Sequence, residues 1–375
     1  MEAMTLFGSA FNGKRVLVTG HTGFKGSWLC EWLLGLGSQV TGLSLPPQTE
    51  PSLFAELGLG RRLRHIVGDI QEPDVVAKAV SESKPDFVFH LAAQALVRQS
   101  YLRPRETFQV NAMGTLHLLE ALRNLKKPCA AVFITTDKCY ENREWHHGYR
   151  EEDMLGGRDP YSASKAAAEL IIASYRNSFF QDHPVKIASS RAGNVIGGGD
   201  WATDRIIPDC ITALRKKKPI QVRNSHATRP WQHVLEPLSG YLWLGASLAD
   251  SKLRRCGLPL LASAFNFGPN RDSNRTVAEL VEEVLKHWPG RWEDKTDPGA
   301  PHEAGLLQLS TDKAYALLRW IPVWSFSEAV AGTVDWYRTA QHFTSAKEFQ
   351  KQTQAQIAQY IQCAGRLHAP WTVLP

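Results

Sequence analysis

A tyrosine and a lysine stand four residues apart in the segment PYSASKAAAEL, as Tyr161 and Lys165. On a helix, residues at this spacing lie on the same face, so the lysine ammonium can lie close to the tyrosine phenol. A free tyrosine has a pKa of about 10, and a neighbouring cation lowers that pKa by favouring the phenolate. The pair therefore indicates a base that can deprotonate an alcohol, although the same spacing also occurs in ordinary helix packing.

An acid and a base stand side by side in the segment FITTDKCY, where an apolar run ends in threonines. The usual interpretation of Asp137 and Lys138 is a pair of solvated surface charges. Next to a tyrosine base they could instead serve as a second acid and base. Burial raises the pKa of an aspartate and lowers that of a lysine, the directions such roles require, whereas their mutual attraction opposes both shifts. Thr136, at the end of the same strand, would help polarise the alcohol.

Three glycines, Gly20, Gly23 and Gly26, follow an apolar strand in the segment TGHTGFKGSW and precede a helix. Glycine at this place permits a tight turn and lets a pyrophosphate approach the helix N-terminus, where free N–H groups favour anions. The spacing is G-x-x-G-x-x-G and differs from the G-x-G-x-x-G of many dehydrogenases. The position between strand and helix predicts a dinucleotide site, and the alternative is a turn that only needs glycine.

The expected acid for the ribose hydroxyls is missing, because residues 43–46 read LSLP. Ser44 could contact the ribose, and charge leaves the choice between NAD and NADP open. Asp69 and Ile70 follow the third expected strand and could contact an adenine ring. Asp69 could equally cap the helix that follows it.

The chemistry-bearing residues lie at the ends of elements that alternate between strand and helix. Short apolar runs predict strands at 15–20, 38–45, 63–70, 85–93, 130–136 and 185–193. Helical spacing predicts helices at 24–37, 72–83, 106–125 and 162–180. Strands separated by helices of this length predict an α/β fold, a doubly wound parallel sheet of the Rossmann type.

The alternation weakens in the second half of the chain, where helices expected at 276–288 and 325–340 are separated by loops. We therefore expect residues 1–193 to bind the dinucleotide and to carry the catalytic residues. Residues 194–375 are expected to form a smaller mixed α/β lobe for the substrate, partly interleaved with the first part.

Composition narrows the function classes. The 375 residues carry a formal net charge of +6 with 21% charged residues, which argues against nucleic acid and allows a small anionic substrate. The six cysteines show no disulfide or metal spacing, so we expect reduced thiols, no metal and a cytoplasmic location. No apolar run is long enough to span a membrane, so no membrane partner is expected.

Several motifs together resemble the extended short-chain dehydrogenase/reductases that act on nucleotide sugars. The resemblance covers nearly the whole chain and rests on TGHTGFKGSW, HLAAQ, VNAMGT, TTDKCY, YSASK, RAGNVIGGGDW and RPWQHV. It implies that Thr136, Tyr161 and Lys165 are catalytic. In this family the residues after the catalytic threonine separate the 4,6-dehydratases from the rest. Asp-Lys at this place resembles the branch that acts on CDP-glucose and uses NAD.

The resemblance also implies a reaction. Tyr161 would take the proton of the 4-hydroxyl while hydride passes from carbon 4 of the sugar to NAD, and the hydride would return to carbon 6 after water has left. Lys138 would be the base at carbon 5 and Asp137 the acid at the departing hydroxyl, with the opposite assignment left open. The alternatives are an epimerase or reductase, a dehydratase of dTDP- or GDP-hexoses, and a non-catalytic dinucleotide-binding regulator.

The expected binding residues follow the same motifs. Those expected at the cofactor are Gly20, His21, Thr22, Gly23, Phe24, Lys25, Gly26, Ser44, Asp69, Ile70, Leu91, Ala92, Ala93, Asn111, Thr135, Tyr161 and Lys165. Those expected at the nucleotide sugar are Gln94, Arg191, Asn194, Arg205, Arg223 and Arg229. The family also implies a homodimer or homotetramer that pairs the helices at 106–125 and 162–180.

Overall fold

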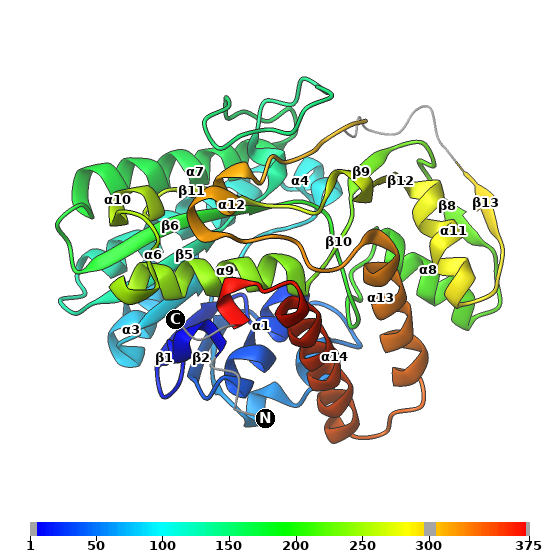
Figure 1. Ribbon diagram of the computed structural model, residues 1–375, viewed down its shortest axis with the longest axis horizontal. Coiled ribbons are helices and arrows are strands. Elements are labelled where there is room, and N and C mark those ends of the chain that lie inside the picture. Colours follow the sequence, from blue (N-terminus) through cyan, green and yellow to red (C-terminus); the bar gives the residue numbers. More distant parts are fainter. Residues whose placement is uncertain (1–5, 296–304, 373–375) are drawn as a thin grey trace.

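The computed structural model describes residues 6–295 and 305–372 and is built on one large parallel sheet (Figure 1). The sheet has seven strands in the order β11-β6-β5-β4-β1-β2-β3. Their bounds are β1 Arg15–Thr19, β2 Gln39–Ser44, β3 Arg64–Val67, β4 Phe87–His90, β5 Cys129–Ile134, β6 Val185–Ala192 and β11 Ala264–Phe267. The chain order reverses between β1 and β4, which confirms the doubly wound fold expected from the sequence.

Successive residues of each central strand enter two different cores, because side chains alternate across a sheet. On β5, Val132 belongs to the core shared with α1 and α9, whereas Phe133 belongs to the core under α3, α6 and α7. The bounds of these helices are α1 Phe24–Gly35, α3 Pro73–Ser83, α6 Gly114–Arg123, α7 Pro160–Phe179 and α9 Leu235–Ala249. Because helices cover both faces of the sheet, the end of the sheet at the carboxyl ends of the strands is left open to a ligand.

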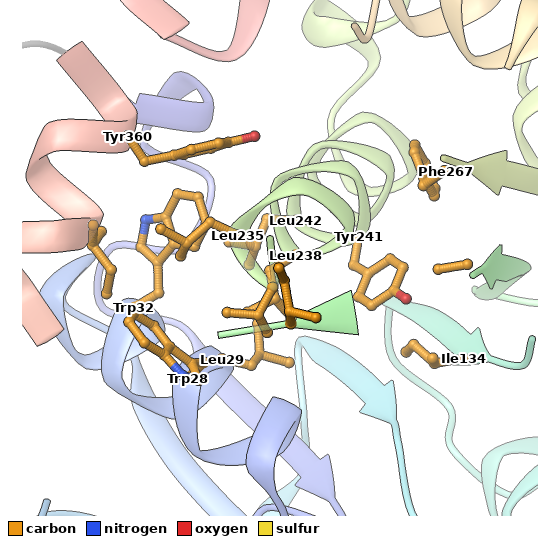
Figure 2. Packing of buried hydrophobic residues seen from close by; sticks show 14 of the residues in the cluster. Trp28, Leu29, Trp32, Ile134, Leu235, Leu238, Tyr241, Leu242, Phe267 and Tyr360 are labelled. Carbon is orange, nitrogen blue, oxygen red and sulfur yellow. The ribbon is translucent and has the colours of Figure 1, made fainter. Parts of the chain in front are cut away.

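The first of these cores is rich in aromatic residues. Figure 2 shows Trp28 and Trp32 of α1 packed near Leu235 and Leu238 of α9, with Tyr360 of the C-terminal helix nearby. That helix, α14 (Ala346–Arg366), packs on α1. Helices α9 and α14, from the second half of the chain, therefore pack on α1, the helix that follows the glycine loop.

The second half supplies both the sheet and a set of smaller elements. Strand β11, helix α9 and helix α14 all follow residue 193 yet pack on the sheet or on α1. The remaining strands are β7 Val195–Ile196, β8 Ile220–Val222, β9 Thr228–Pro230, β10 Gln232–His233, β12 Asn274–Thr276 and β13 Trp292–Asp294. The division into a cofactor part and a substrate part stays a prediction, and this interleaving is compatible with it.

The helices outside the two sheet layers are short or belong to the second half. They are α2 Leu53–Glu56, α4 Val97–Leu102, α5 Pro104–Phe108, α8 Ile206–Arg215, α10 Leu258–Leu261, α11 Val277–His287, α12 Asp312–Leu318 and α13 Phe326–Ala340. Helices α11 and α13 match the expectations at 276–288 and 325–340. Each begins with a capping box, Thr276 with Glu279 and Ser325 with Glu328.

The long helix expected at 106–125 is interrupted. Helix α5 ends at Phe108, a π-helical turn follows at Gln109–Met113, and α6 begins at Gly114. The turn contains Asn111, whose amide donates to Ser164 on α7 at 2.9 Å. A local widening of the helix thus directs a polar side chain toward the helix that carries Tyr161 and Lys165.

Candidate active site

The start of α7 is fixed by its own sequence. Asp159 caps the helix, since its carboxylate accepts from the backbone N–H of Ser162 at 2.9 Å and from its hydroxyl at 2.6 Å. Pro160 occupies the first turn, where its missing N–H costs nothing. Tyr161 and Lys165 follow one turn apart on one face, and both are buried. The expected pair is therefore present in a helix whose entry geometry is set.

Burial dominates the electrostatics of this pair. It raises the pKa of Tyr161 to about 12, while a hydrogen bond with Thr136 and the charge of Arg205 lower it. The pKa of Lys165 is lowered to about 8 by burial, with Glu169 opposing. In the protein alone, desolvation of Tyr161 therefore outweighs its favourable neighbours. The expectation that Lys165 together with an oxidised nicotinamide lowers the tyrosine pKa stays a prediction.

Asp137 and Lys138 lie in a short 3₁₀ turn that Thr136 caps at the carboxyl end of β5. The Thr136 hydroxyl donates to one carboxylate oxygen of Asp137 at 3.0 Å and accepts from the Lys138 N–H at 3.4 Å. Asp137 is 1% exposed, and its other oxygen, Oδ2, is buried without a hydrogen-bond partner among the described residues. Burial raises the pKa of Asp137, whereas Lys138 and Arg229 lower it. A buried acid with one free oxygen is suited to exchanging a proton with a ligand.

Strand β6 ends beside this acid. A side chain at Gly193 would place its Cβ 2.9 Å from the Asp137 carboxylate, so glycine leaves room for the acid. Arg205 bonds to Asp200 at 2.8 Å, and its charge acts on Tyr161. Arg229 is buried and acts electrostatically on Asp137. Two of the arginines expected at the substrate therefore lie around the catalytic group, and Asn194, half-buried, follows Gly193 directly.

Arg191, which the sequence predicted at the substrate, is instead bonded to buried protein groups. Its side chain is 4% exposed, and it donates to Glu169 at 2.9 Å and to the Tyr140 hydroxyl at 2.8 Å. Glu169 also accepts from Ser189 at 2.8 Å. Sequence reasoning missed Glu169, although it stands four residues after Lys165, the spacing that signalled the first pair.

Gln94 and Arg223 are also committed to protein neighbours. The Gln94 amide donates to the Leu96 carbonyl at 3.0 Å and accepts from the Leu96 N–H at 2.6 Å, which closes its own loop. Arg223 pairs with Asp209 at 2.7 Å and with Asp204. The Arg223 side chain is 38% exposed, and contacts of these two residues with the nucleotide sugar stay predictions.

The glycine loop forms a cradle that other residues would fill. A Cβ at Gly26 would lie 2.2 Å from the Gly20 carbonyl oxygen, and one at Gly20 would lie 2.6 Å from the Ala92 N atom. Gly20 also has a φ of +73°, a conformation that side chains disfavour. Gly23 is the N-cap of α1 and offers no side chain to its first N–H groups. The loop thus has room for a pyrophosphate, and Leu91 and Ala92 lie beside Gly20. Contacts of Leu91, Ala92 and Ala93 with a cofactor stay predictions.

Near the end of β2, where an acidic residue for the ribose is missing, the side chains of Ser44, Thr22 and His21 make contacts within the protein. Ser44, the last residue of β2, bonds to Thr22 of the glycine loop at 2.8 Å. His21 is fully buried and bonds to His65 of β3 at 2.7 Å. Burial, with His65 adding to it, lowers the pKa of His21 to about 4, so its ring is neutral at neutral pH. These contacts tie the loop to two strands, and a ribose contact of Ser44 stays a prediction.

Other residues expected at the cofactor also have protein partners. Asp69 accepts from the Gln71 N–H at 2.9 Å, and the Ile70 side chain is 5% exposed within the second core. Asn111 accepts from the Gln94 N–H at 2.9 Å. Thr135 donates to Glu169. Contacts of these residues with a cofactor stay predictions.

His90, the last residue of β4, bonds to Thr19 at 2.7 Å and so has a protein partner within the sheet. Across residues 6–295 and 305–372 no group of three or more His, Cys, Asp or Glu side chains could hold a metal ion. The same residues contain no helix long and apolar enough to cross a membrane.

A dinucleotide cradle and a Thr136, Tyr161 and Lys165 group on a doubly wound sheet define an extended short-chain dehydrogenase/reductase. A model of the GDP-mannose 4,6 dehydratase family matches residues 17–333, and the chain belongs to this family.

The relatives narrow the comparison. The chain is 45% identical over 334 residues to a CDP-glucose 4,6-dehydratase of Salmonella typhimurium, which covers 88% of this chain and 91% of that protein. It is 25% identical over 351 residues to a dTDP-glucose 4,6-dehydratase of Xanthomonas campestris, covering 87% of this chain and 93% of the relative. A solved UDP-glucose 4-epimerase of Thermus thermophilus, in complex with NAD, aligns with a TM-score of 0.73 at 27% identity and covers 87% of this chain and 99% of its own.

Proposed function

We propose that this protein removes water from CDP-D-glucose to give CDP-4-keto-6-deoxy-D-glucose, with tightly bound NAD as a cofactor regenerated in each turnover. The observation that carries the proposal is the buried Asp137 beside Lys138, held by Thr136 next to Tyr161. An epimerase or a reductase needs no second acid and base. The relative named as a CDP-glucose 4,6-dehydratase supports the choice of nucleotide.

The residues present fit NAD, because the glycine cradle admits a pyrophosphate only while Gly20 and Gly26 lack side chains. When bound, NAD accepts a hydride from carbon 4, returns it at carbon 6 and adds a positive charge that favours the Tyr161 phenolate. Without an acid at the end of β2, Ser44 and Thr22 offer hydroxyl groups to the ribose.

Tyr161 takes the proton of the sugar 4-hydroxyl. Thr136, which shares a hydrogen bond with the phenol, polarises the same hydroxyl. The Lys165 ammonium donates to the Ile134 carbonyl at 3.3 Å, which holds it at the end of β5. Because Lys165 and Tyr161 lie on the same face of α7, the positive charge of the lysine is close enough to stabilise the tyrosine phenolate.

Lys138 and Asp137 carry out the elimination once carbon 4 is a ketone, which acidifies the hydrogen on carbon 5. Lys138 removes that proton, and Asp137 protonates the hydroxyl that leaves carbon 6 as water. The raised pKa of Asp137 and its unpartnered Oδ2 support the acid role. The substrate diphosphate is held by Arg205 and Arg229, whose planar forks match phosphate oxygens.

The same proposal includes assembly and location. Large apolar side chains are exposed on and before α7, among them Met113 at 42%, Leu170 at 60% and Phe179 at 45%. They support a homodimer or homotetramer formed through α6 and α7. Leu119 and Ile172 of the same two helices are buried in the protomer core. All six cysteines are unpaired, which supports a cytoplasmic location.

Incubation with CDP-, dTDP- and GDP-hexoses, followed by mass spectrometry, tests the proposal. The expected result is loss of one water from CDP-glucose and little change in the others. A product of unchanged mass but inverted configuration at carbon 4 would identify an epimerase, and binding of NAD without any product would favour a regulator.

A further inference from the structure

The turn that carries Asp137 and Lys138 is held at both of its ends. Thr136 caps its start, and Tyr140 follows its end, where the Tyr140 N–H donates to the Asp137 carbonyl at 3.5 Å. The turn between them has three residues, Asp137–Cys139. In so short a turn, the direction of the Lys138 side chain depends on how the backbone is held on each side.

Tyr140 is anchored through its hydroxyl group between two strands of the large sheet. The hydroxyl donates to the side-chain oxygen of Asn266 on β11 at 2.7 Å and accepts from Arg191 on β6 at 2.8 Å. Tyr140 is 1% exposed, and burial raises its pKa well above the ordinary value, so the phenol keeps the proton that it donates. Asn266 is also buried, and among the described residues this hydroxyl is the one donor to its side-chain oxygen.

The Tyr140 ring belongs to a stack of aromatic side chains. It lies on the Tyr149 ring with 5.2 Å between the centres and 18° between the planes, and the Arg191 guanidinium is 4.9 Å from its centre. Tyr149 is equally buried, but its hydroxyl donates to the Asn142 side chain at 3.0 Å and accepts from the Arg143 N–H at 2.6 Å. Two tyrosines of one cluster therefore differ, because only the Tyr140 hydroxyl bonds to the sheet and the other bonds to its own loop.

The hydroxyl anchors the turn separately from α7, the helix that carries the tyrosine base and its lysine. Without that hydroxyl, Arg191 keeps two acceptors, Glu169 at 2.9 Å and the Glu151 carbonyl at 3.0 Å. The ion pair that supports Lys165 therefore survives this change. Loss of the hydroxyl loosens the turn and leaves α7 in place.

We propose that Tyr140 is a positioning residue for the elimination step, because its hydroxyl fixes the turn from which Lys138 and Asp137 remove water. The inference rests on the proposed function and adds that oxidation at carbon 4 and elimination depend on different anchors. Misplacing a reacting group by about 1 Å can cost roughly a hundredfold in rate, so a small movement of the turn is enough to slow elimination.

Rapid mixing with CDP-glucose measures both steps in Tyr140→Phe, which keeps the ring and its stack. The absorbance of the reduced cofactor reports oxidation at carbon 4, and exchange of the carbon 5 hydrogen in deuterium oxide reports the start of elimination. We expect oxidation at the wild-type rate and elimination slowed on the order of tenfold, so that reduced cofactor accumulates. The ratio of the two rates does not depend on the fraction of folded protein. Asn266→Ala, which removes the acceptor of the same hydrogen bond, should change this ratio in the same direction.

Tyr149→Phe is the matched control, since it removes a buried hydroxyl from the same cluster and should leave the ratio at the wild-type value. Equal slowing of both steps by Tyr140→Phe, or the same change of ratio in Tyr149→Phe, would assign Tyr140 to the stability of the cluster and overturn the inference. An unchanged ratio would overturn it as well, with the proposed function intact as long as wild type dehydrates CDP-glucose. If wild type neither reduces its cofactor nor removes water from CDP-glucose, the proposed function fails and the inference fails with it.

Discussion

Arg191 of β6 donates to Glu169 of α7 at 2.9 Å, and both side chains are almost completely buried. Glu169 follows Lys165 by one turn, so this ion pair is continuous with the catalytic face of α7. The negative charge of Glu169 raises the pKa of Lys165, while Arg191 keeps Glu169 ionised. A structural ion pair therefore supports the cation next to the catalytic tyrosine.

Breaking this pair should strongly destabilise the fold. Arg191→Met leaves an uncompensated buried carboxylate, and we expect it to lower the free energy of unfolding by about 3–5 kcal/mol, measured by urea denaturation. Arg275→Met removes an exposed ion pair with Glu279 at 3.3 Å and should cost less than about 1 kcal/mol. Equal effects of the two variants would contradict the assignment of Arg191 to the core.

The pH profile should report the Lys165 cation. The pKa of this lysine is lowered to about 8, so its charge is present below that pH and is lost as pH rises through it. The slope of log(kcat/KM) against pH should therefore decrease near pH 8. Glu169→Gln removes a charge that raises this pKa, so the change in slope should move to lower pH, measured at a temperature at which the variant is folded. If Glu169→Gln leaves the change in slope at the same pH as in wild type, that change does not arise from Lys165.

Two variants distinguish the acid from the base. Lys138→Ala should reduce the bound cofactor when CDP-glucose is added and then stall, with no exchange of the carbon 5 hydrogen in deuterium oxide. Asp137→Asn should also stall before dehydration, yet exchange that hydrogen, because its base is intact. Full turnover by Lys138→Ala would remove this lysine from the mechanism, and exchange in that variant would assign the base to another group.

Two glycines of α1 provide a matched test of the cradle. Gly26→Ala would place a Cβ 2.2 Å from the Gly20 carbonyl oxygen, whereas no heavy atom of the described residues would lie within 4 Å of a Cβ at Gly35. We expect Gly26→Ala to weaken NAD binding by roughly a hundredfold, about 2.7 kcal/mol, and Gly35→Ala to leave it unchanged. Calorimetric titration with NAD measures both, and normal binding by Gly26→Ala would argue against the loop as the pyrophosphate site.

Local sequence patterns predicted what local physics determines. The first six strands, the glycine loop and the Tyr161 and Lys165 pair each depend on residues close in sequence, and the structure contains them all. Strand β11 escaped prediction because it is short, three apolar residues and Asn266, and forms a strand by pairing with β6. Helix α14 was not predicted because its sequence is largely polar. Its packing on α1, which the sequence does not show, stabilises it.

The site residues divide in the same way. Asp137 could be proposed from its place after β5, but the room that Gly193 leaves for it and the charge of Arg229, which lowers its pKa, come from distant parts of the sequence. Arg191 stood in a motif that suggested phosphate, and only the approach of β6 to α7 shows that its partner is Glu169. Sequence spacing cannot show which buried charges meet across two elements.

The fate of the hydrogen on carbon 4 tests the central claim most directly. CDP-glucose carrying deuterium at carbon 4 should give a product whose new methyl group at carbon 6 contains that deuterium, observed by nuclear magnetic resonance. Deuterium in the water or in released cofactor, with none in the methyl group, would contradict the account.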